Sequence, residues 1–273
     1  MEMHNSRGTM SRKLGQYDHA LTDLDRAIEL DPTYALAYVN RGATLHDLKR
    51  YDEALADFGK AIELDPTNAH AFSNRGVTNW GLRRYGEALV DFGKAIELDP
   101  SFAVGYLNRG GLNGDLKKHD QSLRDLDKAI QFDPNLVLAY CNRGNTYRGV
   151  QKYDRALIDC IKAIELDPAS TLAHMIRGST YYDLQQYDRA LADYGKAIEL
   201  DPANALAYSA RGDTYTQLEQ WDRALPDFTK AIELDATDVR AYNNRGQAYS
   251  SLRQYDLALL RSVRASSYRF RSK

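Results

Sequence analysis

The sequence is poor in features that would point to several large classes of protein. It holds only two cysteines, Cys141 and Cys160, and no Cys-x-x-Cys motif, so neither a disulfide framework nor a structural zinc site is indicated, and a reducing, cytoplasmic compartment is favoured. No apolar run approaches the ~18 residues of a membrane-spanning helix, and the amino terminus lacks a signal-peptide pattern. The formal net charge of -2 leaves no excess of one sign. We therefore expect no membrane partner and no nucleic-acid partner.

Motifs of enzymes are also missing. None of the six histidines belongs to a His-Glu-x-x-His motif, and no glycine-rich phosphate loop occurs. His46 and His70 could serve a metal or acid–base site, but lining a binding surface suits them better. We expect no catalytic residues, no metal and no cofactor.

What the sequence contains instead is one pattern written again and again. The run YDEALADFGKAIELDP at 51–66 returns with small changes, and a proline recurs every 34 residues from Pro32 to Pro202. Such a period is typical of stacked helical repeats. The chain divides into eight repeats, which we expect to form a single domain: 1–34, 35–68, 69–102, 103–136, 137–170, 171–204, 205–238 and 239–273. Each residue then has a position from 1 to 34 in its repeat.

Each repeat predicts two helices. Positions 3, 7, 10 and 14 form the inward stripe of the first helix. The second helix begins near position 18, where Asp52 can cap it, and stops at the Asp-Pro pair. Glycine at position 8 and alanine at positions 20 and 27 let the helices approach closely. A lone pair would leave half of its apolar surface in water, so the repeats must stack.

The pattern consists of a small residue at position 3, aromatics at 4, 11 and 24, Gly42 and its equivalents at 8, Tyr51 at 17, and alanines at 20 and 27. It resembles the tetratricopeptide repeat over the whole chain. The resemblance implies an all-α, right-handed α-solenoid of about eight helix-turn-helix units, or sixteen helices. It also implies a non-catalytic protein–protein interaction scaffold that binds an extended or helical peptide segment in a concave groove.

Arginine occupies position 7 in all eight repeats, where the family commonly has leucine, and aspartate occupies position 23 in seven. An inward-facing arginine needs a partner, because an unpaired buried charge is very costly. The predicted structural ion pairs are Arg41 with Asp57, Arg75 with Asp91, and Arg109 with Asp125. The alternative is a row of arginines that binds phosphate or carboxylate.

The helical period places positions 2, 5, 6, 9, 12 and 13 opposite the inward stripe, on the face that lines the groove in tetratricopeptide arrays. Position 6 repeats asparagine, at Asn40, Asn74, Asn108, Asn142 and Asn244. An amide can donate and accept, so such a row can pair with a peptide backbone. This is similar to the asparagine row of the O-linked N-acetylglucosamine transferase repeat domain. Alternatively, these amides bond neighbouring helices or water.

Apolar residues on the same face predict side-chain pockets. Leu138 and Leu172 at position 2, and Leu107 and Met175 at position 5, would contact ligand side chains, and Trp80 and Tyr182 at position 12 would offer stacking surfaces. The alternative is that neighbouring first helices cover them.

Three further expectations concern partners and ends. The lysine at position 5 and arginine at position 6 of the carboxylate clamp for chaperone tails are absent, so that partner is not expected. Ser262 and Ser266 suit a capping helix before the basic tail, or the chain is a fragment of a longer array. The alternative function is a structural or self-associating module.

Overall fold

The computed structural model describes residues 1–253, and this part of the chain contains helices joined by turns, with no strand. The helices are α1 (Glu2–Lys13), α2 (Tyr17–Leu30), α3 (Ala35–Asp47), α4 (Tyr51–Leu64), α5 (Ala69–Gly81), α6 (Tyr85–Leu98), α7 (Ala103–Asp115), α8 (His119–Phe132), α9 (Val137–Gly149), α10 (Tyr153–Leu166), α11 (Thr171–Asp183), α12 (Tyr187–Leu200), α13 (Ala205–Gln217) and α14 (Trp221–Leu234). Residues 239–253 are also helical. The predicted all-α helix-turn-helix repeat is confirmed. The sixteenth helix, Ser262, Ser266 and the basic tail lie outside the described residues.

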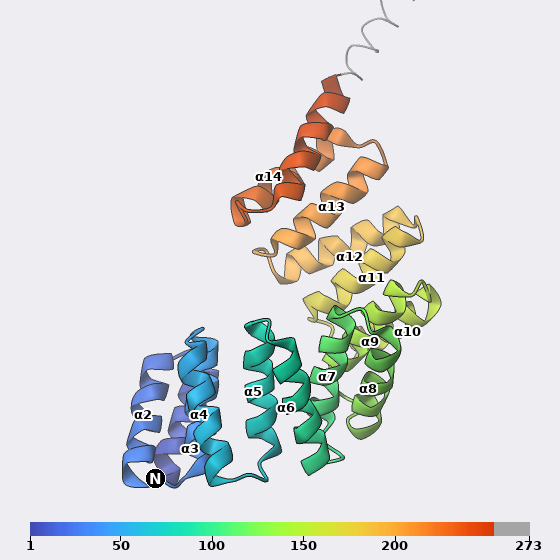
Figure 1. Cartoon of the computed structure of the whole chain (residues 1–273). Helices are drawn as coiled ribbons and strands as arrows, with labels where there is room; N and C mark the ends of the chain where they lie inside the picture. Colours follow the sequence, from blue (N-terminus) through green and yellow to red (C-terminus); the bar gives the residue numbers. More distant parts are fainter. Residues whose placement is uncertain (254–273) are drawn as a thin grey trace, which may run out of the picture. The chain divides into compact units, whose positions relative to one another are not determined.

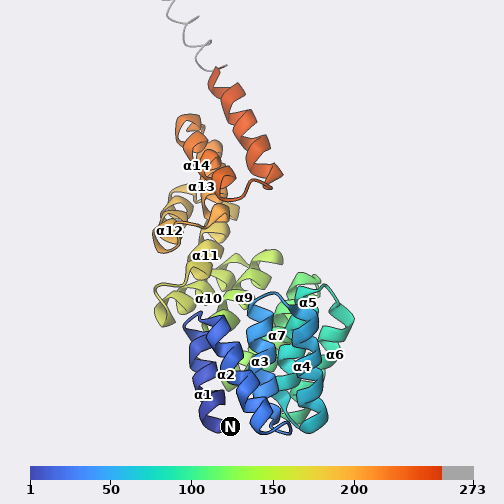
Figure 2. The same ribbon diagram turned by 90° about the vertical axis from the view of Figure 1, so that its left-hand side faces the viewer.

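The chain forms two compact units, Met1–Thr146 and Tyr147–Lys273, with their boundary inside α9. Within each unit consecutive helices pack as antiparallel pairs (Figure 1). In the first unit, α1, α3, α5 and α7 contact one another in sequence, and α2, α4 and α6 each pack on the first helix of the following repeat (Figure 2). The second helices of this unit do not pack on one another. The single domain stays a prediction.

Two turns set the length of every helix pair. After the first helix, position 15 takes a left-handed conformation, at Gly15 with φ 72° and at the non-glycine residue Lys49 with φ 59°. After the second helix, the aspartate before proline is extended and its carboxylate accepts a bond from the backbone two residues on, as from Thr33 to Asp31 at 2.9 Å. Proline cannot continue the helix, and this turn takes its place.

Small residues allow the two helices of a repeat to touch. The alanines at positions 20 and 27, such as Ala54 and Ala61, are fully buried. Gly42 lies against the Phe58 ring so closely that an added Cβ would stand 2.8 Å from a ring carbon. The same close contact recurs at Gly76, Gly110, Gly178 and Gly212, so glycine at position 8 is a packing requirement in these repeats. Among residues 1–253, every helix is too short or too polar to span a bilayer.

Candidate functional site

The predicted ion pairs form between the two helices of each repeat. Arg41 Nε and Nη2 donate to the Asp57 carboxylate at 2.8 and 2.7 Å, and Arg109 donates to Asp125 in the same bidentate way at 2.9 and 2.7 Å. The Arg75 guanidinium reaches Asp91 at 2.6 Å. The Asp57 side chain is 8% exposed and that of Arg41 is 25% exposed. The carboxylates are thus buried, while the arginines reach solvent on one side.

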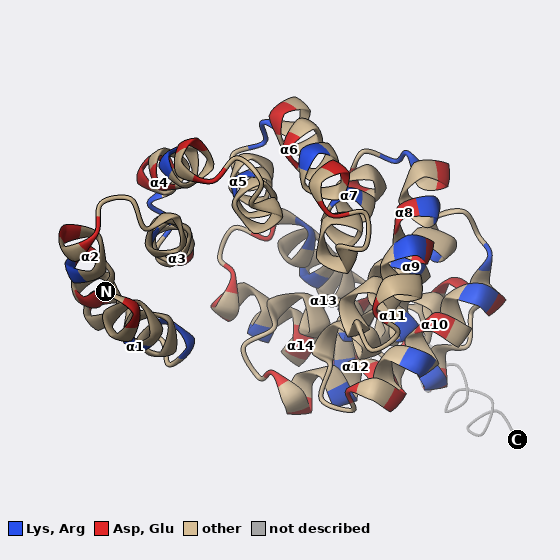
Figure 3. Ribbon diagram, turned by 90° about the horizontal axis from the view of Figure 1, so that it is seen from below, with Lys and Arg blue, Asp and Glu red and all other residues tan. Residues whose placement is uncertain are grey.

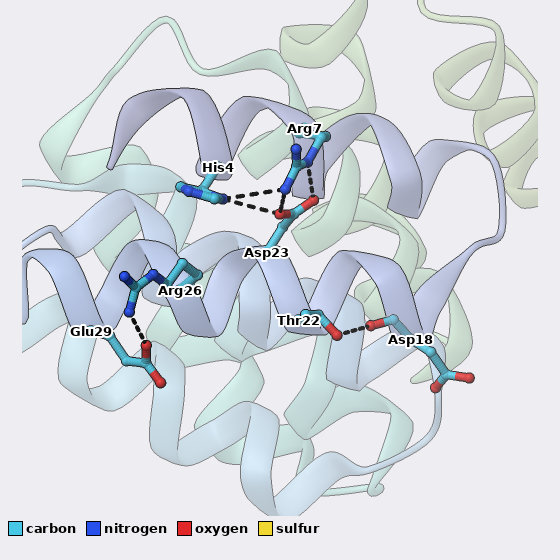
Figure 4. A network of polar contacts seen from close by, with 7 residues as sticks. All are labelled: His4, Arg7, Asp18, Thr22, Asp23, Arg26 and Glu29. Carbon is cyan, nitrogen blue, oxygen red and sulfur yellow. Dashed lines mark hydrogen bonds and ion pairs between the residues drawn. The ribbon is translucent and has the colours of Figure 1, made fainter.

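Basic and acidic residues are interleaved along the helices of both units (Figure 3). The arginine–aspartate pairs of successive repeats form a series, which we call the ion-pair ladder. Figure 4 shows its first member, where Arg7 and His4 on α1 both point to Asp23 on α2. The hydrogen bonds from Arg7 lower the pKa of Asp23 to about 2. Arg41 is also held by its own helix, since its guanidinium lies over the Tyr38 ring at 5.6 Å from its centre. These contacts give the row a structural role.

Three asparagines of the position-6 row bond the preceding repeat. Asn40 Nδ2 donates to Asn5 Oδ1 at 2.8 Å, and Asn108 Nδ2 donates to Ser73 Oγ at 3.1 Å, each over 35 residues of sequence. Asn244 Nδ2 donates to Asp213 at 2.6 Å. These three amides link neighbouring first helices, which was the alternative to ligand binding.

The other two asparagines of the row have no such partner. The residues 35 positions before Asn74 and Asn142 are Val39 and Leu107, whose side chains offer no polar atom. Both asparagines are half-buried, and within residues 1–253 neither side-chain amide forms a hydrogen bond. Their donors and acceptors are therefore not used by other side chains in this part of the chain.

A second link on the same face joins position 12 of one repeat to position 13 of the next. Trp80 Nε1 donates to Asp115 at 3.1 Å, in the way that Arg12 donates to Asp47 at 2.7 Å and Arg148 to Asp183 at 3.0 Å. A Cβ on Gly111 would lie 3.0 Å from the Trp80 ring and 3.3 Å from Asn142 Nδ2. Trp80 and the unbonded Asn142 amide therefore flank one stretch of bare backbone.

The apolar groove residues divide by position. Leu138 and Leu172 at position 2 are 50% and 42% exposed. Leu107 at position 5 is only 7% exposed and packs with Leu126 and Ala139, so its assignment to an open groove is wrong. Ala139 lies on α9, the first helix of the following repeat, and this helix covers Leu107. Met175, at the same position, is half-buried and borders a cavity.

This cavity, of about 380 Å³, lies in the second compact unit. Its lining residues are Arg148, Met175, Ser179, Tyr182, Asp183, Tyr194, Leu206, Ala210, Asp213 and Arg240. All of them except Tyr194 occupy the predicted groove positions 2, 5, 6, 9, 12 and 13 of four consecutive repeats. The Tyr182 ring packs edge-on against Tyr187, with centres 5.6 Å apart.

The cavity wall combines apolar surface with charges of both signs. Burial raises the pKa of the Asp213 carboxyl, which accepts a bond from Asn244 and lies 4.0 Å from Arg240 Nη2. Burial also raises the pKa of Tyr194 to about 12, and its hydroxyl donates to Ser179 at 3.1 Å. Such a wall suits a ligand that has both apolar and polar groups better than it suits a single ion. Residues 1–253 hold no cluster of three or more metal-ligating side chains.

Family models described as "TPR repeat" match residues 8–49, 178–218 and 212–252, and models described as "Tetratricopeptide repeat" match 35–68, 69–102 and 137–170. Three similar solved structures show how far the likeness extends. A tetratricopeptide repeat protein from Parabacteroides merdae is 20% identical with a TM-score of 0.71, over 91% of this chain and 98% of its own. The APC/C hetero-tetramer Cut9-Hcn1 has a TM-score of 0.76 at 15% identity and matches 85% of this chain, which spans 48% of that one.

The third structure is YrrB, described as a TPR protein with an unusual peptide-binding site. It is 25% identical with a TM-score of 0.50, over 69% of this chain and 97% of its own. No curated protein sequence matches significantly.

Proposed function

Because the chain belongs to the tetratricopeptide repeat family, a family of generally non-catalytic scaffolds, we propose that it is a non-enzymatic cytoplasmic scaffold that binds a peptide segment on the groove face of its first helices. The observation that carries the proposal is the cavity of about 380 Å³ whose lining, apart from Tyr194, comes from groove positions. A concave site with apolar walls and a few placed polar groups is the usual form of a binding site.

Each compact unit contributes its own contacts. In the first unit, the Asn74 and Asn142 amides pair with peptide backbone whatever its sequence, and Trp80 offers an aromatic surface beside Asn142. In the second unit, Met175 and Leu206 contact apolar side chains of the ligand. Backbone pairing then supplies affinity in the first unit, and the cavity supplies selectivity in the second unit.

The amide contribution is tested by comparing Asn74→Ala with Asn108→Ala. Peptides selected from a random display library on the full chain serve as probes, and isothermal titration measures their affinities. Asn74→Ala should weaken binding of all selected peptides by about 1 kcal/mol, because one hydrogen bond is lost, and should leave stability unchanged. Asn108→Ala removes a bond to Ser73 and should lower stability instead. Wild-type affinity in Asn74→Ala would contradict the backbone role.

The cavity contribution is tested with two lysine substitutions of equal exposure. Leu206 is 63% exposed and lines the cavity, whereas Ile158 is 65% exposed on the second helix α10. Leu206→Lys should abolish binding of some selected peptides and spare others, and Ile158→Lys should change none. Light scattering of the same samples tests the alternative: a dimer that Leu206→Lys dissociates, with no peptide selected, would favour self-association.

A further inference from the structure

Two cavities lie at equivalent places on the outer side of the first unit, away from the groove. One, of about 390 Å³, is lined by Leu21, Asp25, Arg41, Leu45, Arg50, Glu53, Ala56 and Asp57. The other, of about 690 Å³, is lined by Leu55, Arg75, Asn79, Gly86, Glu87, Val90 and Asp91. Both have a leucine at position 21 and the arginine and aspartate of the ion pair at positions 7 and 23. Position 7 faces opposite to the groove positions on its helix.

The two cavities differ in the number of carboxylates on the arginine. Arg41 bonds Asp57 through Nε and Nη2, and its Nη1 donates to Asp25 on α2 at 2.7 Å. Arg143 is held in the same way, since its Nη1 donates to Asp127 on the preceding second helix at 2.8 Å. A second carboxylate on Nη1 is therefore part of this arrangement wherever position 25 of the preceding repeat is aspartate.

Arg75 lacks this second carboxylate. Its Nε and Nη2 bond Asp91, but Gly59 stands where Asp25 stands in the repeat before, and within residues 1–253 Nη1 donates no hydrogen bond. A Cβ added to Gly59 or to Gly86 would meet no atom within 4 Å. The space in front of Arg75 is open.

We propose that the cavity between α4 and α6 binds the side-chain carboxylate of an aspartate or glutamate from a partner polypeptide, in the place that Asp25 takes on Arg41. A carboxylate there completes the arginine's hydrogen bonds with a charge-assisted bond. Val90, 71% exposed at the cavity rim, gives an apolar contact for the residue next to the acid.

The second cavity lacks one acid that the first one has. Arg41 and Arg50 face three acids, Asp57, Glu53 and Asp25. In the second cavity Arg75 lies with Asp91 and Glu87, and Gly59 replaces the third acid. The missing acid is the group that the partner polypeptide would supply.

The test uses the capped dipeptide acetyl-Asp-Leu-amide and its uncharged counterpart acetyl-Asn-Leu-amide. Titration into the full chain is followed by the Arg75 Nε–H signal in nuclear magnetic resonance spectra. The aspartate dipeptide should shift this signal saturably. The asparagine dipeptide should bind about tenfold more weakly, because an uncharged amide oxygen replaces the charged carboxylate as hydrogen-bond acceptor. Arg41, already held by Asp25, should not respond.

Two exchanges between the cavities make the test decisive. Gly59→Asp supplies the carboxylate within the chain and should weaken the aspartate dipeptide about tenfold, whereas the isosteric Gly59→Asn should leave most of the binding. In the mirror variant Asp25→Gly, the Arg41 signal should begin to respond. The proposal is overturned if the Arg75 signal does not shift in the wild type, if both dipeptides act alike, or if Gly59→Asp and Gly59→Asn weaken binding equally.

Discussion

The Arg109–Asp125 pair offers the most direct measurement of what the ion-pair ladder contributes. Arg109→Leu removes two bonds of 2.9 and 2.7 Å to the Asp125 carboxylate, whose side chain is 10% exposed. The remaining hydrogen bond to Asp125 comes from Asn113 Nδ2 at 3.3 Å. This long bond from an uncharged amide does not compensate for the two lost guanidinium bonds. The variant therefore leaves a buried carboxylate with one weak donor.

The expected loss of stability has several contributions. A carboxyl group of ordinary pKa, about 3.9, can be protonated at pH 7 for about 4 kcal/mol, which limits the part that comes from the unpaired charge. Breaking a fully buried pair costs about 3–5 kcal/mol. Because the Arg109 side chain is 30% exposed, water reaches the site and lowers the cost. We expect a loss of about 2–4 kcal/mol, and recovery of most of it in Arg109→Leu with Asp125→Leu.

The assay has to be local, since repeat arrays can unfold in parts. Hydrogen exchange measured by mass spectrometry on α7 and α8, with α11 and α12 as the internal reference, reports the change in the free energy of opening. Urea unfolding followed by circular dichroism gives the global value. A single variant as protected as the wild type would refute the reasoning, and so would a double variant no more stable than the single one.

Two further predictions follow from other repeats. The pKa of Asp23 is about 2 in the folded chain, below the ordinary value of ~3.9, so its contribution to stability is complete above about pH 4 and is lost as the pH falls toward 2. Arg7→Gln should therefore begin to unfold at a higher pH than the wild type when acid unfolding is followed by circular dichroism. An unchanged transition would contradict this. Gly42→Ala should destabilise by about 1–3 kcal/mol because its Cβ meets the Phe58 ring, whereas Gly93→Ala, with open space around it, should stabilise by about 0.5–1 kcal/mol; equal urea midpoints would be inconsistent with the packing argument.

The repeat period and the residue pattern were sufficient to predict the helix pairs. The arginine and aspartate series predicted which side chains meet, because they recur with the same period and on facing stripes, as Arg41 and Asp57 do. Both inferences depend on contacts within one repeat, where the spacing along the chain fixes the geometry. The sequence was informative at that scale.

Contacts between repeats were harder to predict. A helical wheel placed Leu107 on the groove face, but it describes an isolated helix and contains no neighbour to cover position 5. For the same reason the helical wheel could not predict the hydrogen bonds of the asparagines, since the partner of Asn108 is Ser73, at position 5 of the repeat before. A signal was present in the alternation of polar and apolar residues at position 5: Asn5, Val39, Ser73 and Leu107.

This alternation changes what counts as the repeating module of the array. Bonded and unbonded asparagines follow one another with a period of two repeats in the first unit, so the 68-residue pair is the length that carries the groove pattern. Deleting 69–102 alone would set Asn108 after Val39 and leave it without a polar partner, while Asn142 would still follow Leu107 and stay unbonded. Deleting 69–136 would leave Asn142 after Val39, again without a polar partner. Within the first unit, loss of an even number of repeats therefore leaves the first asparagine after the junction in its original bonding state, whereas loss of an odd number switches it.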